Sequence, residues 1–395
     1  MVFARSITTL ELCTSIRIAS GTFRSKCKAL GHENEMLQHR FSRECFRSSR
    51  LWWRVSRGNA FLHGDIHEEV YMSLPLGLHH EGESLLINIF SSVLINTCFK
   101  QSAFDNSLFV KINGNFFIAL LVYVDDIVIA SNDQENMDEL KKFLNGCFKL
   151  KDLGNLKYFL GLEVGRSSKG ISVSQRHYVL QFLSDTGYLG CKTRKTPMDL
   201  NVKLSQDEGD LIDDPSMYRR MIGKLLYLTI TRPDLSFSVN RLSQFLIKPR
   251  IPYLQAAYHV LQYVKATVGQ GLLYSSSSAI ELKAFADSDW AACLDTRRSI
   301  SGFCVFIGDS LVSWKSKKQH IVFRSSAKAE YHSMENATYE LMWMFSLFKY
   351  LHINHLQPAL LFCDNQAALH ITTNPIFHER TKHIEIDCHL VREKV

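Results

Sequence analysis

The stretch FFIALLVYVDDIVIA, residues 116–130, sets two adjacent aspartates, Asp125 and Asp126, between two apolar runs. Neighbouring carboxylates repel each other and resist burial in apolar surroundings. A divalent cation resolves that conflict, and two such ions about 3.5–4 Å apart can clamp the attacking and leaving oxygens of a phosphoryl transfer. The pair is therefore a candidate metal site. The plainer alternative is an exposed Asp-Asp turn, which any hairpin can carry.

The runs on either side of this pair are rich in β-branched and aromatic residues, which favour strands. Asn113 and Gly114 precede them as a hairpin turn signal. Periodicity and turn residues predict strands over 107–111, 116–123, 127–130, 157–164 and 171–173, and helices over 132–148, 176–186, 218–228, 234–246 and 252–267. The apolar run 116–124 is too short to cross a membrane, so we expect no membrane partner.

The composition of the chain is that of a folded protein. Its 395 residues are enough for two or three domains, and the 46% hydrophobic and 22% charged content is ordinary for globular proteins. A net charge of +7 fits a polyanionic partner without requiring one. None of the 10 cysteines forms a Cys-x-x-Cys pair, which argues against a zinc ribbon or a redox motif.

The C-terminal part of the chain shows a different pattern. Gly269, Gly271 and the serines at 275–278 mark a boundary. After it, the sequence predicts strands over 281–286, 301–307 and 310–316, a helix over 326–350, a short apolar strand over 359–363 and further helix. This order is typical of a mixed α/β domain.

Acidic residues recur in this part where a nuclease would need them. Asp287 follows a predicted strand, Glu330 lies on the first turns of a helix, Asp364 ends a strand, and Glu385 and Asp387 open the last helix. Phosphodiester hydrolysis with two metal ions needs several carboxylates that converge from different elements. Each acid taken alone is more simply a solvated side chain. Residues two apart on a helix face different ways, so only one of the last two acids should reach a common site.

Basic residues near these acids are candidates for contacts with phosphate groups. They include Lys315, Lys317 and Lys318 beside Trp314, together with Arg297, Arg298, Arg380 and Lys382. The alternative is a solubilising surface.

Taken together, these motifs resemble the reverse transcriptase and ribonuclease H region of copia-type retrotransposon Pol polyproteins. YVDD at 123–126 resembles the metal-binding signature of reverse transcriptases, and AFLHGD at 60–65, YFLGLEV at 158–164 and TRPD at 231–234 match copia-type segments in the same order. The resemblance covers the chain from about residue 59 to its C-terminus. It implies an α/β protein with an α+β palm fragment of a reverse transcriptase, a helical connection and a ribonuclease H-like domain with a mixed sheet.

The resemblance also implies the domain limits and the site residues. We expect residues 1–58 to lack an assignable fold, 59–200 to be palm-like, 201–280 to form the helical connection and 281–395 to be ribonuclease H-like. Asp287, Glu330 and Asp364 are then metal ligands for Mg²⁺ or Mn²⁺, Glu385 aligns best as the fourth acid with Asp387 as the alternative, and an RNA–DNA hybrid is the expected partner. The oligomeric state stays open.

Two departures from the family pattern affect the polymerase. Ser56 stands where the family carries a third metal-binding aspartate, and serine is a poor ligand for Mg²⁺. A family segment that helps to hold template and nucleotide is missing between Glu83 and Phe99. We therefore expect cleavage of RNA in RNA–DNA hybrids to be retained and RNA-directed DNA synthesis to be lost. The alternatives are a nucleic-acid-binding relic without catalysis and a chain that folds poorly because apolar strand edges are exposed.

Overall fold

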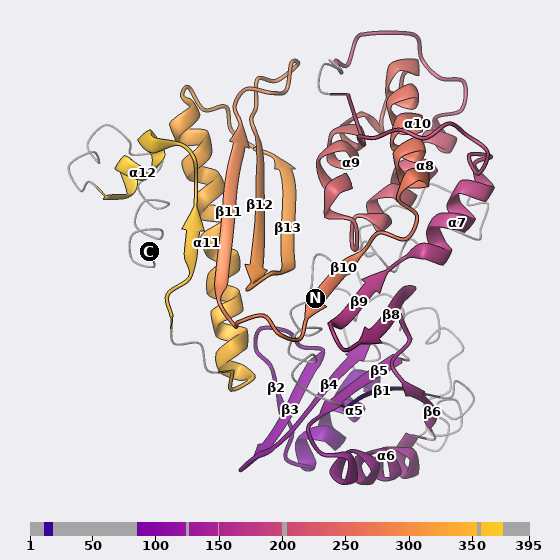
Figure 1. Ribbon diagram of the computed structural model, residues 1–395, viewed down its shortest axis with the longest axis vertical. Coiled ribbons are helices and arrows are strands. Elements are labelled where there is room, and N and C mark those ends of the chain that lie inside the picture. Colours follow the sequence, from indigo (N-terminus) through magenta and orange to yellow (C-terminus); the bar gives the residue numbers. More distant parts are fainter. Residues whose placement is uncertain are drawn as a thin grey trace. The chain divides into compact units, whose positions relative to one another are not determined.

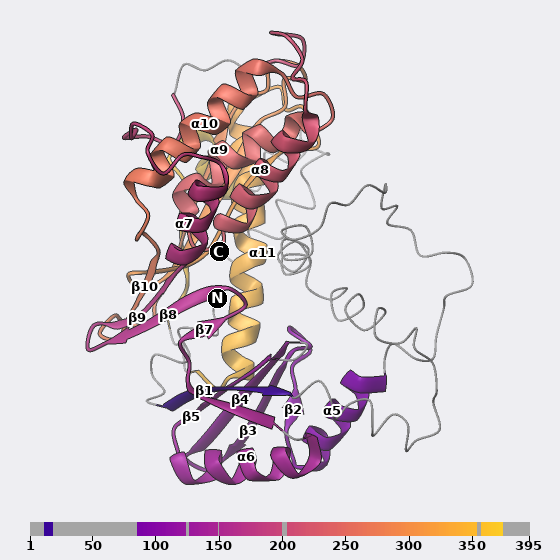
Figure 2. The ribbon, with the colours of Figure 1, turned by 90° about the vertical axis from the view of Figure 1, so that its right-hand side faces the viewer.

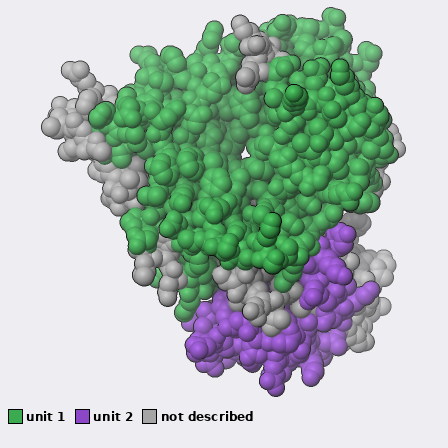
Figure 3. All heavy atoms as spheres, viewed as in Figure 1, with its two compact units in different colours: residues 1–5, 161–395 green, residues 6–160 purple. Residues whose placement is uncertain are grey.

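The computed structural model describes residues 12–18, 85–123, 126–148, 150–199, 204–353 and 357–373. The chain divides into two compact units, residues 6–160 and residues 1–5 with 161–395 (Figures 1 and 3). Both units combine sheets with helices, which confirms the predicted α/β class. Among the described residues, no helix is both long and apolar enough to cross a membrane. The domain limits expected from the sequence stay predictions.

The smaller unit is a six-stranded sheet with the order β2-β3-β4-β5-β1-β6. Its elements are β1 (Leu12–Ile18), α5 (Leu85–Asn96), β2 (Lys100–Gln101), β3 (Leu108–Asn113), β4 (Phe116–Tyr123), β5 (Asp126–Ser131), α6 (Gln134–Phe148) and β6 (Leu150–Asn155), followed by the short β7 (Tyr158–Phe159). Phe90 and Leu94 of α5 and Met137 and Leu144 of α6 share one core with the central strands, so both helices pack on the sheet (Figure 2).

The strands predicted on either side of the paired aspartates are confirmed, and they pair antiparallel with Tyr123 opposite Asp126. β3, β4, β5 and α6 lie within one or two residues of the expected ranges. Asn113 pairs with Phe116, and Gly114 takes a φ of 59°, the left-handed conformation that glycine adopts without strain. Alternation of side chains across the pleat explains the burial of Ile118 and Leu120 against the helices.

Four elements of this unit were missed in the sequence: α5, β1, β2 and β6. α5 lies between Glu83 and Phe99, where we expected a family segment to be missing, β2 has only two residues, and β6 has only half-buried and exposed side chains. β1 lies within residues 1–58, to which the sequence assigned no fold, yet it runs antiparallel between β5 and β6, with Ile16 opposite Ile127. A strand of seven residues has little local signal, and only the edges of β5 and β6 give it partners. The stretch VYMSLP at 70–75, which also reads as a strand ended by proline, lies outside the described residues.

The larger unit begins with an antiparallel ribbon of β8 (Leu162–Ser167), β9 (Gly170–Ser174) and β10 (Leu272–Ser275). One continuous strand over 157–164 was predicted, and this was wrong. Leu160 and Gly161 take φ values of 50° and 77°, which interrupt the extended backbone between β7 and β8. Gly170 is required where β9 meets β10, because a Cβ there would lie 1.9 Å from the carbonyl oxygen of Tyr274.

Between β9 and β10 the chain forms a helical bundle of α7 (Arg176–Asp185), α8 (Pro215–Leu228), α9 (Ser236–Leu242) and α10 (Ile251–Ala266). These helices share a core that includes Phe182, Ile222, Leu225 and Val260. Asp214 caps α8 by accepting from the backbone N–H groups of Ser216 and Met217. The single helix expected over 234–246 is instead α9 between two 3-10 turns, Pro233–Leu235 and Ser243–Phe245.

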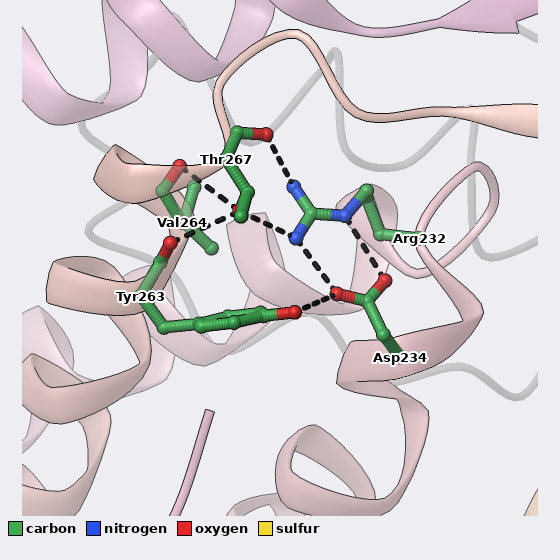
Figure 4. Close-up of polar contacts among 5 residues, drawn as sticks. All are labelled: Arg232, Asp234, Tyr263, Val264 and Thr267. Carbon is green, nitrogen blue, oxygen red and sulfur yellow. Dashed lines mark hydrogen bonds and ion pairs between the residues drawn. The ribbon is translucent and has the colours of Figure 1, made fainter. Parts of the chain in front are cut away.

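A buried arginine ties the start of this broken helix to the end of α10 (Figure 4). Arg232, which is 1% exposed, donates from Nε to Asp234 Oδ1 at 3.0 Å and from one terminal nitrogen to the Thr267 carbonyl oxygen at 3.0 Å. Its other terminal nitrogen reaches Asp234 Oδ2 and Thr267 Oγ1, each at 2.7 Å. Tyr263 donates to Asp234 Oδ2 at 2.9 Å. The charge is therefore buried with its hydrogen bonds made.

The last part of the larger unit is a four-stranded sheet with the order β13-β12-β11-β14. Its elements are β11 (Leu282–Asp289), β12 (Ile300–Ile307), β13 (Ser310–Lys318), α11 (Ser326–Tyr350), β14 (Leu360–Phe362) and α12 (Gln366–Thr373). The first three strands are antiparallel and β14 is parallel to β11, so the sheet is mixed as predicted. α11 begins and ends at the predicted residues and packs along one face of the sheet (Figure 1).

Replacement of Arg232 should destabilise the larger unit. Arg232→Met leaves the Asp234 carboxylate and the Thr267 carbonyl oxygen without their partner in a desolvated site, which should cost about 3 kcal/mol or more of unfolding free energy. The midpoint of urea unfolding, followed by circular dichroism, measures this loss. The matched control is Arg220→Met, which removes an exposed arginine 3.9 Å from Asp214 and should cost less than about 1 kcal/mol. Equal losses in the two variants would show that the Arg232 network contributes no special stability.

Candidate active site

Two of the predicted acids meet because β14 runs parallel to β11. In the register of this pair, Phe285 lies opposite Phe362. Asp287 and Asp364 each follow two residues later, and the carboxyl ends of parallel strands meet at one edge of a sheet. The two carboxylates therefore come to the same edge from segments far apart in the chain.

α11 brings the third acid to this edge. Ser333 Oγ donates to the Asp287 carbonyl oxygen at 2.8 Å and to the Gly302 carbonyl oxygen at 2.9 Å, which fixes the helix against β11 and β12. Glu330 lies almost one turn earlier on the helix and is buried. Asp287, Glu330 and Asp364 are thus brought together, as the spacing along the sequence predicts.

The carboxyl group of Glu330 has an unusual environment. Its pKa is raised to about 7, mainly by burial and also by the nearby carboxylates of Asp287 and Asp364, while the hydrogen bond from the Ser288 N–H group opposes the rise. The side chains of Glu330 and Asp287 also share a hydrogen bond. The three carboxyl groups repel one another when ionised, and one of them is buried. A bound cation would relieve this repulsion.

Cys363 adjoins the acids, and the sequence analysis missed it. Ligand atoms of Glu330, Cys363 and Asp364 all lie within 4.8 Å of one another, and Cys363 Sγ is 4.0 Å from Glu330 Oε2. Burial raises the pKa of the Cys363 thiol, so the group stays protonated near neutral pH. Mg²⁺ prefers oxygen ligands. The donor set therefore fits a hard cation held by the carboxylates, with the thiol as a neighbour. The position of Cys363 directly before Asp364 was the signal in the sequence that could have indicated its place in the site.

A second residue missed in the sequence, Gln319, supports the site. Its side-chain nitrogen is buried and lies 3.3 Å from Ser288 Oγ, 2.7 Å from Ser301 Oγ and 3.0 Å from the Ala329 carbonyl oxygen. These bonds join β11, β12 and the first turn of α11. No local sequence pattern indicates this role, because the partners lie in three separate segments.

The predicted basic residues lie in two places. Arg297 and Arg298 belong to the loop between β11 and β12, where Arg297 is exposed and takes a φ of 52°. Trp314, Lys315, Lys317 and Lys318 lie on β13. Successive side chains of a strand point to opposite faces, so Lys315 and Lys317 share one face and Trp314 and Lys318 the other.

Trp314 has a structural partner within the larger unit. Its indole Nε1 donates to the Thr229 carbonyl oxygen, at the end of α8, at 3.1 Å. Lys318 Nζ lies 3.8 Å from Cys293 Sγ. Lys315 and Lys317 are the exposed members of this group, and they are the ones free to approach a phosphate chain.

Of the residues predicted for the polymerase site, Asp126 is described and is half-buried at the start of β5, opposite Tyr123. β1 is the neighbour of β5 on the other side, and its sequence LCTSIRI contains no acid. Several further predicted residues lie outside the described part of the chain: Asp125, Ser56, Arg380, Lys382, Glu385 and Asp387.

Comparison with known proteins identifies the reverse transcriptase part of the chain. Residues 49–200 match the family described as reverse transcriptase (RNA-dependent DNA polymerase). The Pol polyprotein from transposon RE1 of Arabidopsis thaliana is 38% identical over 356 residues, which are 85% of this chain and 24% of that protein. The Pol polyprotein from transposon TNT 1-94 of Nicotiana tabacum is 30% identical over 366 residues, 85% of this chain and 27% of that protein.

A shorter relative is matched over most of its own length. An uncharacterised mitochondrial protein of Arabidopsis thaliana is 40% identical over 224 residues, which are 57% of this chain and 93% of that protein. The chain spans about a quarter of the length of the Pol polyproteins that it matches. It belongs to the Pol polyprotein family of copia-type retrotransposons and contains part of the reverse transcriptase region.

Proposed function

We propose that this chain cleaves the RNA strand of RNA–DNA hybrids in a metal-dependent reaction and has lost RNA-directed DNA synthesis. The observation that carries the proposal is the convergence of Asp287, Glu330 and Asp364 at one sheet edge, around a carboxyl group whose pKa is raised to about 7. We assign this ribonuclease H activity to residues 281–395.

The residues fit Mg²⁺ or Mn²⁺ because they offer several carboxylate oxygens from different elements. Proteins of the reverse transcriptase family use divalent cations and bind nucleic acid. When bound, such ions supply a hydroxide nucleophile near neutral pH and offset charge on the phosphate. Asp287, Glu330 and Asp364 would hold them, with Glu385 or Asp387 as a further ligand.

The chain's own groups prepare the site for this chemistry. The Ser288 N–H group orients the Glu330 carboxyl group, and Gln319 and Ser333 fix the helix that carries it. Asp287 is exposed, so a phosphodiester can approach it from solvent. Glu330, whose pKa is raised to about 7, would release its proton on holding a cation together with Asp287 and Asp364.

Recognition of the hybrid would depend on its backbone. Hybrid duplexes are held mainly through phosphates and 2′-hydroxyls, with little base specificity. Arg297, Lys315 and Lys317 are the exposed cations of the predicted set in the described part of the chain. Arg380 and Lys382 are proposed to add to them.

Loss of polymerase activity follows from the surroundings of Asp126. Two metal ions need a carboxylate from the strand beside the aspartate pair. The strand beside β5 on that side is β1, which has no acid, and Ser56 replaces the family's third aspartate. In the described part of the chain no carboxylate of β1 joins Asp126, and with Ser56 in place of an aspartate the polymerase site lacks a ligand for two ions.

The first prediction concerns cleavage. The full chain should cleave the RNA strand of a labelled hybrid in Mg²⁺ or Mn²⁺, and Asp364→Asn should reduce the rate about a hundredfold or more, since a lost metal ligand removes several kcal/mol of stabilisation. Product lengths on a denaturing gel measure the rate. Asp309→Asn, which changes an exposed aspartate outside the site, is the matched control and should cleave as the parent does. A well-folded chain without cleavage in either metal would leave a nucleic-acid-binding relic as the better account.

The second prediction concerns pH and stability without metal. A carboxyl group with a raised pKa in the folded protein favours the folded state at low pH, and that contribution is lost as pH rises from about 4.5 to about 7. Glu330→Gln should therefore be more stable than the parent at pH 8 in a chelator and show a weaker decline across this range. Mg²⁺ at pH 8 should stabilise the parent more than the variant. Unfolding midpoints measure both effects, and identical pH profiles would contradict the assigned environment of Glu330.

The third prediction concerns DNA synthesis. The full chain should extend no DNA primer on an RNA template in Mg²⁺ or Mn²⁺, under conditions where it cleaves a hybrid, because the palm lacks a third carboxylate. Primer extension with labelled nucleotides is the measurement. Extension that is abolished by Asp126→Asn would disprove the loss of the polymerase.

A further inference from the structure

The segment that follows α7 is held along α10 in an ordered path. Lys265 Nζ donates to the Cys191 carbonyl oxygen at 2.6 Å. Arg194 donates from its backbone N–H to the Gln262 carbonyl oxygen at 3.3 Å and from Nε to Gln262 Oε1 at 3.1 Å. His259 Nε2 donates to the Thr196 carbonyl oxygen at 3.0 Å. The segment therefore runs antiparallel to the helix, and its backbone is fixed at three points.

This segment lines an open cavity of about 380 Å³ whose walls are Lys192, Thr193, Arg194, Lys195, Thr196, Asp199 and His259. Residues 192–196 are all exposed. Asp199 is the single carboxylate of the lining, and it lies 3.7 Å from His259 Nδ1. The cations therefore outnumber the acid.

The two lysines have their charges available. Within the described part of the chain, neither the Lys192 nor the Lys195 ammonium group pairs with a carboxylate. The Nε of Arg194 donates to Gln262 Oε1, and this contact positions the guanidinium beside α10. Cations and threonine hydroxyls on a fixed backbone are the groups that hold phosphate oxygens.

We propose that the cavity formed by Lys192, Arg194 and Lys195 over α10 binds the sugar-phosphate backbone of nucleic acid. The Cα atoms of Lys192 and Lys195 are at most about 11 Å apart, so the two side chains can contact neighbouring phosphates of one strand. We expect no base specificity, because contacts of cations and hydroxyls with the phosphates of nucleic acid carry no sequence information. The inference rests on the proposed function only for its choice of an RNA–DNA hybrid as the probe.

The test measures binding of the full chain to a fluorescent hybrid in a chelator, where cleavage cannot occur, as a function of salt. Lys192→Gln with Lys195→Gln should raise Kd about tenfold at low salt and reduce the slope of log K against log salt by about 2, since each lost phosphate contact removes about 0.9. The matched control, Lys169→Gln with Lys349→Gln, removes the same charge from exposed lysines elsewhere in the unit and should change Kd less than about twofold.

Equal losses of affinity in the two double variants would show that only net charge matters and would overturn the proposal. No loss of affinity in either variant would overturn it as well. Binding of inorganic phosphate at the cavity, with hybrid affinity unchanged by the substitutions, would identify a small-anion site and also overturn it. Gln262→Leu removes the anchor of Arg194 without a change of charge. It should weaken hybrid binding about two- to threefold with an unchanged thermal midpoint, and parent-like binding would contradict the role of Arg194.

Failure of the nuclease is distinguishable from failure of this site. In a chelator the loss of affinity caused by the Lys192 and Lys195 substitutions should be the same whether or not the chain cleaves the hybrid in Mg²⁺, because no acid of the nuclease site lines the cavity. A chain that binds through the cavity but cleaves nothing would sink the proposed function and leave this inference standing.

Discussion

The packing of α8, α9 and α10 depends on the buried guanidinium of Arg232. Between them, Asp234 and Thr267 accept from its Nε and from both terminal nitrogens, so the charge is desolvated with its partners in place. This network joins the turn after α8 to the last turn of α10. Thr231, next to it, donates to Gln175 Oε1 at 2.8 Å, which extends the connection to the start of α7.

Hydrogen bonds from the helical part of the larger unit position its last sheet. The Thr229 carbonyl oxygen accepts from the Trp314 indole on β13, and Asp295, in the loop between β11 and β12, accepts from Ser205 Oγ at 2.7 Å. Aromatic and hydroxyl groups that look suited to nucleic acid in the sequence can thus serve as internal contacts. The groups left for a ligand are those that the fold does not use, such as Lys317, Lys192 and Lys195.

The candidate nuclease site depends on one register. The parallel pairing of Phe285 with Phe362 sets Asp287 and Asp364 at the same level of the sheet, and Ser333 sets α11 so that Glu330 is buried between them. A shift of one residue in either strand would turn one carboxylate to the other face. The pKa of Glu330 is raised because this arrangement leaves the three acids close together and one of them buried.

The sequence by itself determined the local elements and the chemical character of the site. β-branched and aromatic runs and the Asn113-Gly114 turn predicted β3, β4 and β5, and helical periodicity predicted α11 to its exact ends, because these signals come from neighbours in the chain. Only the tertiary structure decided the partners of β1, the support that Gln319 gives to the site and the contact of Trp314 with the end of α8. Each of these depends on contacts between residues far apart in the sequence, whose free energy no local pattern contains.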